Sequence, residues 1–214
     1  MKFTIAYQDT ASLSDADGAR VLAEMTPDRR VRIGSMSAGG ARRLSLLAEL
    51  LARGQAARLL GGDAQDYRIQ DGPGGKPLLL GGEAYVSLSH AGTFAAAAAA
   101  RMPVGVDIER LRPIPEAVLR RVCSAGELAF LKAAGEAAYP TLSLRLWTMK
   151  EAWGKLSGVG VFTSRRFICE TGHGGLQTDY ADCVFTFHDA PPGYLLTSCL
   201  AREETQVHDM TDEI

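Results

Sequence analysis

The sequence predicts an α+β fold made of two halves, each combining β-strands with one principal helix. Alternating apolar and polar residues indicate strands at Tyr85–His90 and Val104–Glu109. Leucines at helical spacing indicate one principal helix near Ala41–Arg53, and an apolar segment near Leu142–Leu156 indicates the other. Because each half contains strands and such a helix, a pseudo-duplication that meets near Pro103 is expected, although the two halves show little sequence similarity.

The amino-terminal half, residues 1–103, is expected to open with a strand at Met1–Tyr7. A helix follows near Ala19–Met25, and Gly61-Gly62 ends a further helical segment after the principal helix. Asp71–Pro77 is a loop by composition, and its glycines let backbone amides approach a ligand closely. Most loops of this kind are only turns, so both interpretations stay open at this point.

The carboxy-terminal half, residues 104–214, alternates short helices and strands. Ala95–Ala100, just before it, favours helix by propensity, but the short interval before the next strand favours a β-hairpin. Helices are expected near Pro115–Val122 and Gly126–Ala134, and strands at Arg166–Glu170, Cys183–His188 and Tyr194–Ala201. The polar residues from Arg202 onward are expected to fray.

Composition excludes several classes of protein. The chain has 214 residues and a net charge of −2, so nothing in its overall charge favours binding to nucleic acid or to an anionic membrane. No segment approaches the ~20 apolar residues that a membrane-spanning helix needs. The 4 cysteines form no CxxC pair, which argues against a zinc site and fits a reducing cytosol. A cytoplasmic protein is expected.

Two acidic segments carry the strongest functional signal. Asp107 and Glu109 alternate on a strand and therefore leave it on one face, and Glu151 and Lys155 stand one helical turn apart. Converging carboxylates repel one another unless a hard divalent cation such as Mg²⁺ lies among them. The alternative is a solvated strand edge and an ordinary helix-surface ion pair. Apolar neighbours on both elements, Val106 among them, argue against that alternative.

At this point the chain resembles a known family, the surfactin-synthetase-activating (Sfp) type of 4′-phosphopantetheinyl transferase. The resemblance rests on an ordered series of motifs and is strongest from residue 75 to residue 160. The motifs are Gly75-Lys76-Pro77, Ser87-Leu88-Ser89-His90, Gly105-Val106-Asp107-Ile108-Glu109, Ser124-Ala125-Gly126-Glu127 and Trp147-Thr148-Met149-Lys150-Glu151-Ala152.

The resemblance implies a pseudo-dimer of two similar α+β halves with coenzyme A in the cleft between them. It implies transfer of the phosphopantetheine arm of coenzyme A to a serine of an acyl or peptidyl carrier protein, with release of adenosine 3′,5′-bisphosphate. By similarity, Asp107, Glu109 and Glu151 would hold Mg²⁺, for which Mn²⁺ could substitute. Glu151 would also act as the base toward the serine, directly or through a water, and Lys155 would contact the reacting phosphate. A monomer is expected.

The same resemblance assigns residues that bind coenzyme A. Ser89 and His90 would meet the 3′-phosphate, and Lys76 and Pro77 would lie along the nucleotide. The full expected set is Arg29, Arg32, Arg43, Gly75, Lys76, Pro77, Ser89, His90, Asp107 and Lys155.

Three positions depart from the family pattern or are left open by it. Relatives often carry an arginine where this chain has Leu44, so either Arg43 or Arg42 would take over the phosphate contact. Glu127 matches a family acid near the metal cluster that is either a ligand or a support. Val122-Cys123 replaces an aromatic pair, and a buried cysteine is expected there.

Two other functions stay open at this stage: a carrier-protein-binding module that has lost activity, and another Mg²⁺-dependent phosphoryl or nucleotidyl transferase. The three acids and Lys155 are all present, which favours the transferase. The carrier partner and the pathway, whether fatty-acid, polyketide or non-ribosomal peptide synthesis, have no sequence motif. Tolerance for acylated coenzyme A has none either.

Overall fold

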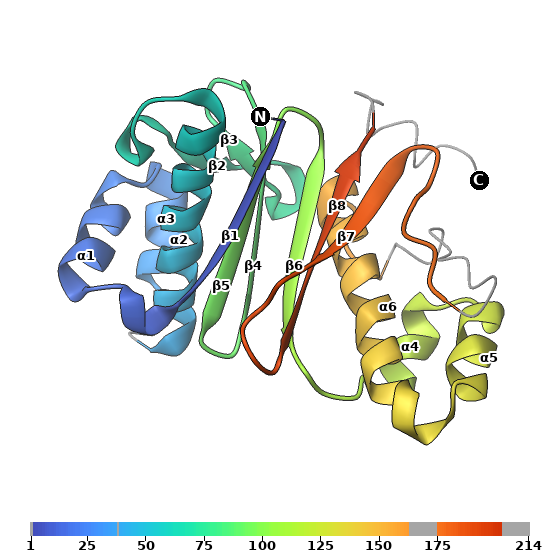
Figure 1. Cartoon of the computed structure of the whole chain (residues 1–214). Helices are drawn as coiled ribbons and strands as arrows, with labels where there is room; N and C mark the ends of the chain where they lie inside the picture. The colour runs from blue at the N-terminus through green and yellow to red at the C-terminus, as the bar shows by residue number, and fades with distance from the viewer. Residues whose placement is uncertain (1, 38, 163–174, 203–214) are drawn as a thin grey trace.

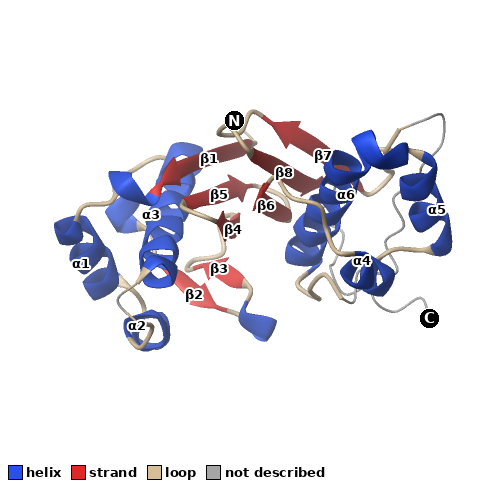
Figure 2. Cartoon of the chain, turned by 90° about the horizontal axis from the view of Figure 1, so that it is seen from below, coloured by secondary structure: helices blue, strands red, loops and turns tan. Residues whose placement is uncertain are grey.

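The structure is a computed structural model that describes residues 2–37, 39–162 and 175–202, and it confirms the α+β class (Figure 1). Two antiparallel sheets stand next to each other in the middle of the molecule. Viewed from below, helices α1 to α3 flank the strands on one side and α4 to α6 flank them on the other (Figure 2). The cleft between the two sheets is therefore the place where the two halves of the chain meet.

The amino-terminal half is a five-stranded sheet of order β1-β5-β4-β3-β2 with three helices. Its strands are β1 (Phe3–Asp9), β2 (Ile69–Asp71), β3 (Pro77–Leu79), β4 (Tyr85–Ala91) and β5 (Phe94–Ala100). Its helices are α1 (Asp15–Glu24), α2 (Pro27–Gly34) and α3 (Gly40–Leu60), and three 3₁₀ turns are η1 (Thr10–Ser12), η2 (Ala64–Asp66) and η3 (Pro73–Gly75). The long helix α3 packs on β5, β1 and β4.

The alanine run forms the inner strand β5, which lies between two packed layers. Ala95, Ala97 and Ala99 belong to the core under α3, whereas Ala96, Ala98 and Ala100 belong to the core that faces the second sheet. All six are fully buried. Small side chains on both faces let the helix and the second sheet approach this strand closely, which overrides the helix propensity of alanine.

Within its described residues, the carboxy-terminal half has a three-stranded sheet of order β6-β8-β7 and three helices. Its strands are β6 (Val104–Arg110), β7 (Cys183–His188) and β8 (Tyr194–Ala201), and its helices are α4 (Glu116–Val122), α5 (Ala125–Ala133) and α6 (Gly135–Ser157). A β-carbon at Gly105 would lie 1.8 Å from the carbonyl oxygen of Ala152, so only glycine lets α6 lie this close to β6.

The two halves repeat one arrangement of a strand, a long helix and a β-hairpin. In the first half these are β1, α3 and β4–β5, and in the second they are β6, α6 and β7–β8. In both sheets the first strand pairs antiparallel with the second strand of the hairpin. The described structure therefore agrees with the expected pseudo-dimer.

The sheets meet along strands β4 and β6, and we call this contact the β4–β6 seam. Strand β6 uses one edge to pair with β8. On its other edge, the backbone N–H of Val106 donates to the Ser87 hydroxyl at 3.0 Å and the N–H of Ile108 donates to the Ser89 hydroxyl at 3.2 Å. Two serine side chains thus satisfy backbone donors that would otherwise be buried without partners.

Most predicted elements are present, with shifted ends. Ala95–Ala100 is a hairpin strand as expected, but its partner is the preceding strand β4, because β6 joins the other sheet. Helix α3 continues past Arg53 to Leu60, so the further helical segment is part of it. Helix α6 begins at Gly135 and contains Pro140, and the prediction placed its start too late. Strands β7 and β8 have the predicted bounds.

Other expectations fall outside the described residues or were missed. The strand expected at Arg166–Glu170 and the tail beyond Arg202 lie outside the described residues. Helix α2 was not predicted. The strands β2 and β3 were not predicted either, because strands of three residues are too short to show a period. Helix α1 begins four residues before the predicted start, because the Ser14 hydroxyl accepts the Asp17 N–H at 3.0 Å and caps it.

Candidate active site

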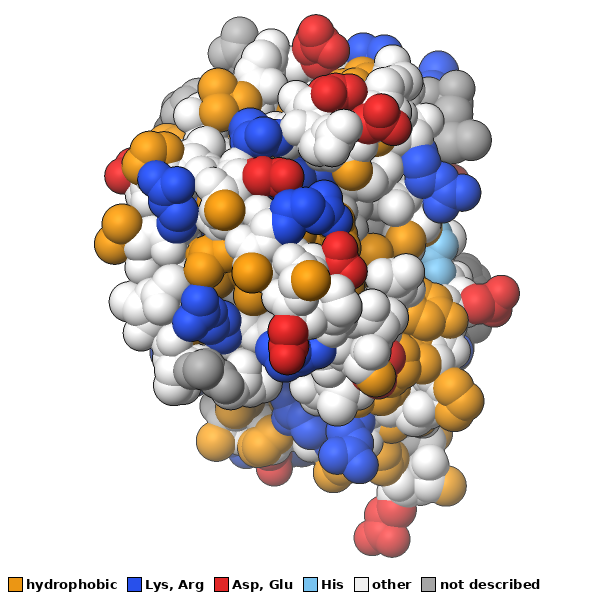
Figure 3. Space-filling model, turned by 90° about the vertical axis from the view of Figure 1, so that its left-hand side faces the viewer, with side chains coloured by type: hydrophobic (Ala, Val, Ile, Leu, Met, Phe, Trp, Pro, Cys, Tyr) orange, Lys and Arg blue, Asp and Glu red, His pale blue; other side chains and the backbone are white. Residues whose placement is uncertain are grey.

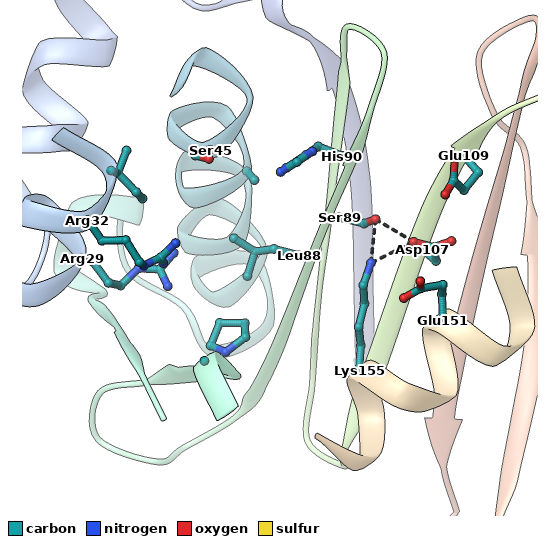
Figure 4. A pocket seen from close by; sticks show the side chains of 14 residues that line it. Arg29, Arg32, Ser45, Leu88, Ser89, His90, Asp107, Glu109, Glu151 and Lys155 are labelled. Carbon is teal, nitrogen blue, oxygen red and sulfur yellow. Dashed lines mark hydrogen bonds and ion pairs between the residues drawn. The ribbon is translucent and has the colours of Figure 1, made fainter. Parts of the chain in front are cut away.

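A cavity of about 420 Å³ opens between the two halves at the β4–β6 seam (Figure 4). One wall comes from the amino-terminal half and carries arginines. The other comes from β6 and α6 and carries carboxylates and a lysine. The functional residues that line it are Arg29, Arg32, Gly75, Pro77, Ser89, His90, Asp107, Glu109, Glu151 and Lys155. Most of the residues expected from the sequence are thus gathered around one cavity.

Asp107, Ser89 and Lys155 form a closed triangle at the centre of the seam (Figure 4). The Lys155 ammonium lies 2.8 Å from Asp107 Oδ1 and donates to the Ser89 hydroxyl at 2.7 Å. The Ser89 hydroxyl donates to the same Asp107 oxygen at 2.8 Å. The Asp107 side chain is 5% exposed, so this contact joins β4, β6 and α6 in a dry environment.

The other two acids are held in their protonated form more readily than usual. Burial, and then the negative charge of Asp107, raise the pKa of Glu151 to about 7. Burial and Asp107 also raise the pKa of Glu109 above its ordinary value. Both shifts have the same physical cause: carboxylates share a partly dry site with too little positive charge. Such a site favours an added cation.

The carboxylates fit a hard divalent cation by their chemistry. Asp107 Oδ2 is buried and has no hydrogen-bond partner, so one oxygen is left for a ligand. Within the described ranges, however, no three acidic, histidine or cysteine side chains are gathered closely enough to hold a metal ion. Glu109 explains part of this, because one of its oxygens accepts from Trp147 Nε1 at 3.1 Å and the other from Arg112 at 3.4 Å. Bringing the acids together requires side-chain movement.

The opposite wall is built on a buried network of charges. Arg29 is 4% exposed and donates to Glu49 Oε2 from Nε at 3.1 Å and from Nη2 at 2.8 Å. It also pairs with Asp71, to which Arg32 donates from Nε at 3.0 Å and from Nη2 at 3.1 Å. Glu49 in turn pairs with the buried Arg53. Arg29 is therefore fixed, whereas the half-exposed Arg32 can turn toward an anion.

Ser89 and His90 do not act as a pair of side chains. As successive residues of β4 they leave the strand in opposite directions, Ser89 toward Asp107 and His90 toward Ser45 of α3 (Figure 4). The Ser89 hydroxyl is saturated within the seam, whereas the His90 ring lines the cavity. Burial, with the Lys155 charge, lowers the pKa of His90. Both residues line the cavity, but their side chains point in opposite directions, so the expectation that both meet one phosphate stays a prediction.

The structure separates two expected basic contacts from the cavity. Arg43 pairs with Asp15 at 2.6 Å and donates to backbone carbonyls at the start of α1, and together with Arg42 it lines a different, smaller cavity. Neither residue lines the cavity at the seam. Lys76 lies beside it, where its ammonium donates to the Leu156 carbonyl of α6. Gly75 and Pro77 line the cavity itself.

Glu127 lies with its helix and not in the cavity. Its side chain accepts from the Ser124 N–H at 2.6 Å and completes a capping box at the start of α5. It also pairs at 3.0 Å with Lys150 of α6, and both side chains are at most 1% exposed. The neighbouring Cys123 is buried, which raises the pKa of its thiol to about 12 and argues against a nucleophile.

Sequence reasoning missed two residues that shape the site. Trp147 was noted only as an apolar residue, but its indole N–H holds Glu109. Asp71 was noted only as part of a loop, but it neutralises both arginines of the opposite wall. A tryptophan four residues before Glu151 on one helix is a signal that could have placed the first. No local signal points to Asp71.

Comparison with known proteins assigns the chain to a family. The family model described as the 4′-phosphopantetheinyl transferase superfamily matches residues 103–199. The chain is 30% identical over 175 residues to the 4′-phosphopantetheinyl transferase psf-1 of Bacillus pumilus, covering 78% of this chain and 74% of that protein. The chain belongs to the 4′-phosphopantetheinyl transferase superfamily. It is also 25% identical over 213 residues to the transferase Sfp of Bacillus subtilis, covering 95% of this chain and 94% of Sfp.

As a 4′-phosphopantetheinyl transferase, the chain is an enzyme of a family that uses coenzyme A. On the face over α1 to α3, basic and acidic side chains are interspersed, so no large area of one charge is seen there (Figure 3). Among the described residues, no helix is both long enough and apolar enough to cross a membrane.

Proposed function

We propose that this 4′-phosphopantetheinyl transferase moves the arm of coenzyme A to a carrier-protein serine in the cavity at the β4–β6 seam. The observation that carries the proposal is the convergence of Asp107, Glu109, Glu151 and Lys155 on one wall of this cavity, opposite Arg29 and Arg32. A pyrophosphate between two such walls would meet cations on both sides and a place for a divalent ion. The family relation supports the same reaction.

The acid cluster would hold Mg²⁺, with Mn²⁺ as a substitute. Asp107 would use its unpartnered Oδ2, and Glu109 and Glu151 would complete the protein ligands after Glu109 leaves Trp147 or Arg112. When bound, the ion neutralises the charge on the pyrophosphate. Removing one carboxylate therefore weakens metal binding and leaves the fold intact.

Lys155 and Glu151 would act on the reacting groups. The Lys155 side chain is 28% exposed and lines the cavity, where its ammonium would contact the phosphate whose bond to the leaving bisphosphate breaks. Glu151 lines the cavity beside Asp107 and Lys155, where it would take the proton of the attacking serine hydroxyl, directly or through a water. Both side chains come from α6, which its contact with β6 holds in place.

The amino-terminal wall would bind the nucleotide part of coenzyme A. Arg32 is half exposed and can meet a phosphate, and the rigid Arg29 adds charge from behind it. His90 would meet the 3′-phosphate from β4, and Gly75 and Pro77 would line the nucleotide from the η3 loop. Lys76 and Arg43 are not included, since their ammonium and guanidinium groups are engaged elsewhere.

We also propose a division of labour between the halves. Residues 1–103 would bind coenzyme A, and residues 104–214 would supply the metal ligands and the catalytic helix. Since both walls come from one chain, the enzyme is expected to work as a monomer. It is also expected to work in the cytoplasm. The second substrate would be an acyl or peptidyl carrier protein.

One incubation tests the proposed reaction. The protein is mixed with coenzyme A, Mg²⁺ and a panel of apo carrier proteins, and intact mass is measured. The expected result is a mass increase by one phosphopantetheine arm on at least one carrier, lost when its acceptor serine is replaced by alanine. Release of phosphate or nucleotide from coenzyme A without modification of any carrier would contradict the proposal.

A further inference from the structure

Ser89 makes more contacts than its sequence position suggests. Its hydroxyl donates one hydrogen bond, to Asp107 Oδ1, and accepts two, from the Ile108 N–H and the Lys155 ammonium. A hydroxyl has one donor and two acceptor sites, so all of its capacity is used. The residue is 6% exposed. Its side chain therefore has nothing left for a ligand while the triangle is closed.

The three partners belong to three different roles. Ile108 is backbone of the seam, Asp107 is a proposed metal ligand, and Lys155 is the proposed phosphate contact. Asp107 and Lys155 lie on separate elements of the carboxy-terminal half, whereas Ser89 lies on β4 of the other half. At the seam, Ser87 repeats the backbone contact, to Val106 at 3.0 Å, and within the described residues it has no hydrogen bond to Asp107 or Lys155.

We infer that Ser89 is a positioning residue, which fixes Asp107 and Lys155 relative to each other across the seam. The Ser89 hydroxyl and the Lys155 ammonium both donate to Oδ1 of Asp107. Oδ2 of the same carboxylate then has no partner and is left for a metal ion. The Ser89 hydroxyl also directs the Lys155 ammonium to a single place at the cavity wall. Because the anchor comes from β4, the geometry of the catalytic groups depends on correct docking of the two halves. The catalytic part of this inference rests on the proposed function.

Ser87 supplies a matched control. Ser87→Ala and Ser89→Ala each remove one buried hydroxyl from the same face of β4 and leave one β6 N–H without its partner. Both variants lose this backbone contact, so amide hydrogen exchange should accelerate at Val106 in the first and at Ile108 in the second. Any difference between them beyond this reports the contacts to Asp107 and Lys155.

The first test needs no activity. Hydrogen-bonded lysine ammonium groups give slowly exchanging proton–nitrogen NMR signals, and the Lys155 signal is assigned by its loss in Lys155→Met. The inference predicts that this signal is present in the wild type and in Ser87→Ala and is lost or broadened in Ser89→Ala. If Ser89→Ala leaves the signal unchanged, the inference is overturned, whatever the fate of the proposed reaction.

The second test measures transfer to a carrier protein at saturating coenzyme A and Mg²⁺. Ser89→Ala should lower kcat at least about tenfold with a small change in the KM for coenzyme A, whereas Ser87→Ala should stay within about twofold of wild type. In the Lys155→Met background, Ser89→Ala should cost much less, since the two residues act as a unit. A raised KM with unchanged kcat, equal losses in both serine variants, or additive losses would each overturn the inference. Failure of the wild type to modify any carrier would instead count against the proposed function.

Discussion

The two halves of the molecule share an arrangement but place different side chains at equivalent positions. Setting the first residue of β1 equal to the first residue of β6 aligns the row Phe3–Ala100–Tyr85 in the first sheet with the row Val104–Leu200–Val184 in the second. Counting along the first strand of each half from these rows, Ala6 corresponds to Asp107 and Gln8 to Glu109. Ala6 packs into the core under α3, whereas Asp107 meets Lys155 of α6. At this pair of positions, the shared scaffold thus carries an apolar side chain in one half and a charged side chain in the other.

A second equivalent pair shows how the helices differ. Thr4 corresponds to Gly105, and the Thr4 hydroxyl donates to the Gln55 carbonyl of α3 at 3.0 Å. At Gly105 the Ala152 carbonyl of α6 leaves no room for even a β-carbon. Helix α6 therefore lies closer to its strand than α3 does, and this brings Glu151 and Lys155 to the edge of β6. The carboxy-terminal half thus differs from the amino-terminal half in the distance between its long helix and its first strand, as well as in the charge at equivalent positions.

The largest effect should follow from removing the catalytic charge of the second half. Lys155→Met keeps an apolar stem and deletes the ammonium, and it should lower kcat at least about a hundredfold, roughly 2.7 kcal/mol of barrier. Rapid-quench transfer at saturating coenzyme A measures this. Lys132→Met, at an exposed lysine of α5, is the control and should have no effect. A fall of less than about threefold for Lys155→Met would contradict the catalytic role and leave Lys155 as a partner in an ordinary ion pair.

The helix distance can be tested by a matched pair of strand variants. Gly105→Ala places a methyl group against backbone atoms of α6 that cannot yield cheaply, and it should lower the free energy of unfolding by about 3 kcal/mol. Thr4→Ala removes one buried hydrogen bond at the equivalent position and should cost about 1 kcal/mol. Urea unfolding compares the two. Equal losses in the free energy of unfolding would contradict the inference that α6 packs closer to β6 than α3 does to β1.

A pair of histidines near the ends of the equivalent strands β4 and β7 tests whether the cavity at the β4–β6 seam binds the nucleotide. His90→Ala should weaken binding of coenzyme A by about 1.5 to 3 kcal/mol and binding of 3′-dephospho-coenzyme A much less. His188, which bonds Ser198 at 2.8 Å, lies outside the active cavity, so His188→Ala should change neither affinity. Calorimetric titration gives all four values. Equal losses for both ligands in His90→Ala would remove His90 from the 3′-phosphate site.

A further effect is a pH dependence of stability that arises from Glu151 in the carboxy-terminal half. Without metal, the folded-state pKa of Glu151 is about 7, above its ordinary value of 4.5. Between these values the folded protein keeps a proton that the unfolded chain has lost, so stability falls as pH rises, and the full cost is present above the folded-state pKa. In chelator, Glu151→Gln should therefore be more stable than wild type near about pH 8 and equal to it near about pH 4. A stability difference that is the same at both pH values would contradict the assignment.

Much of the fold was predictable because the decisive signals are local. Alternation marked β4 and β6, the strands β7 and β8 were predicted with their observed bounds, and a hairpin could be inferred for the alanine run from the short interval that follows it. The ends of the long helices were not predictable, because packing of α3 on the sheet carries it through Gly54, and α6 tolerates Pro140 close to its start.

The composition of the cavity was also predictable in part. The acids on β6 and α6 could be placed on one side by their spacing alone, and they do line one wall. The direction of Ser89, the pairing of Asp71 with Arg29, and the displacement of Arg43 toward Asp15 depend on contacts between residues far apart in the chain. No periodicity or motif contains such contacts, so only the folded structure shows them.

The central claim is that the carboxylates of β6 and α6 form the divalent metal site of this enzyme. The most direct measurement is Mn²⁺ binding followed by electron paramagnetic resonance, in the presence of coenzyme A. Wild type should bind the ion, and Asp107→Asn should bind it at least about tenfold more weakly while keeping its fold by circular dichroism. Asp17→Asn, at an exposed acid of α1, is the control. Unchanged Mn²⁺ affinity in Asp107→Asn would contradict the account.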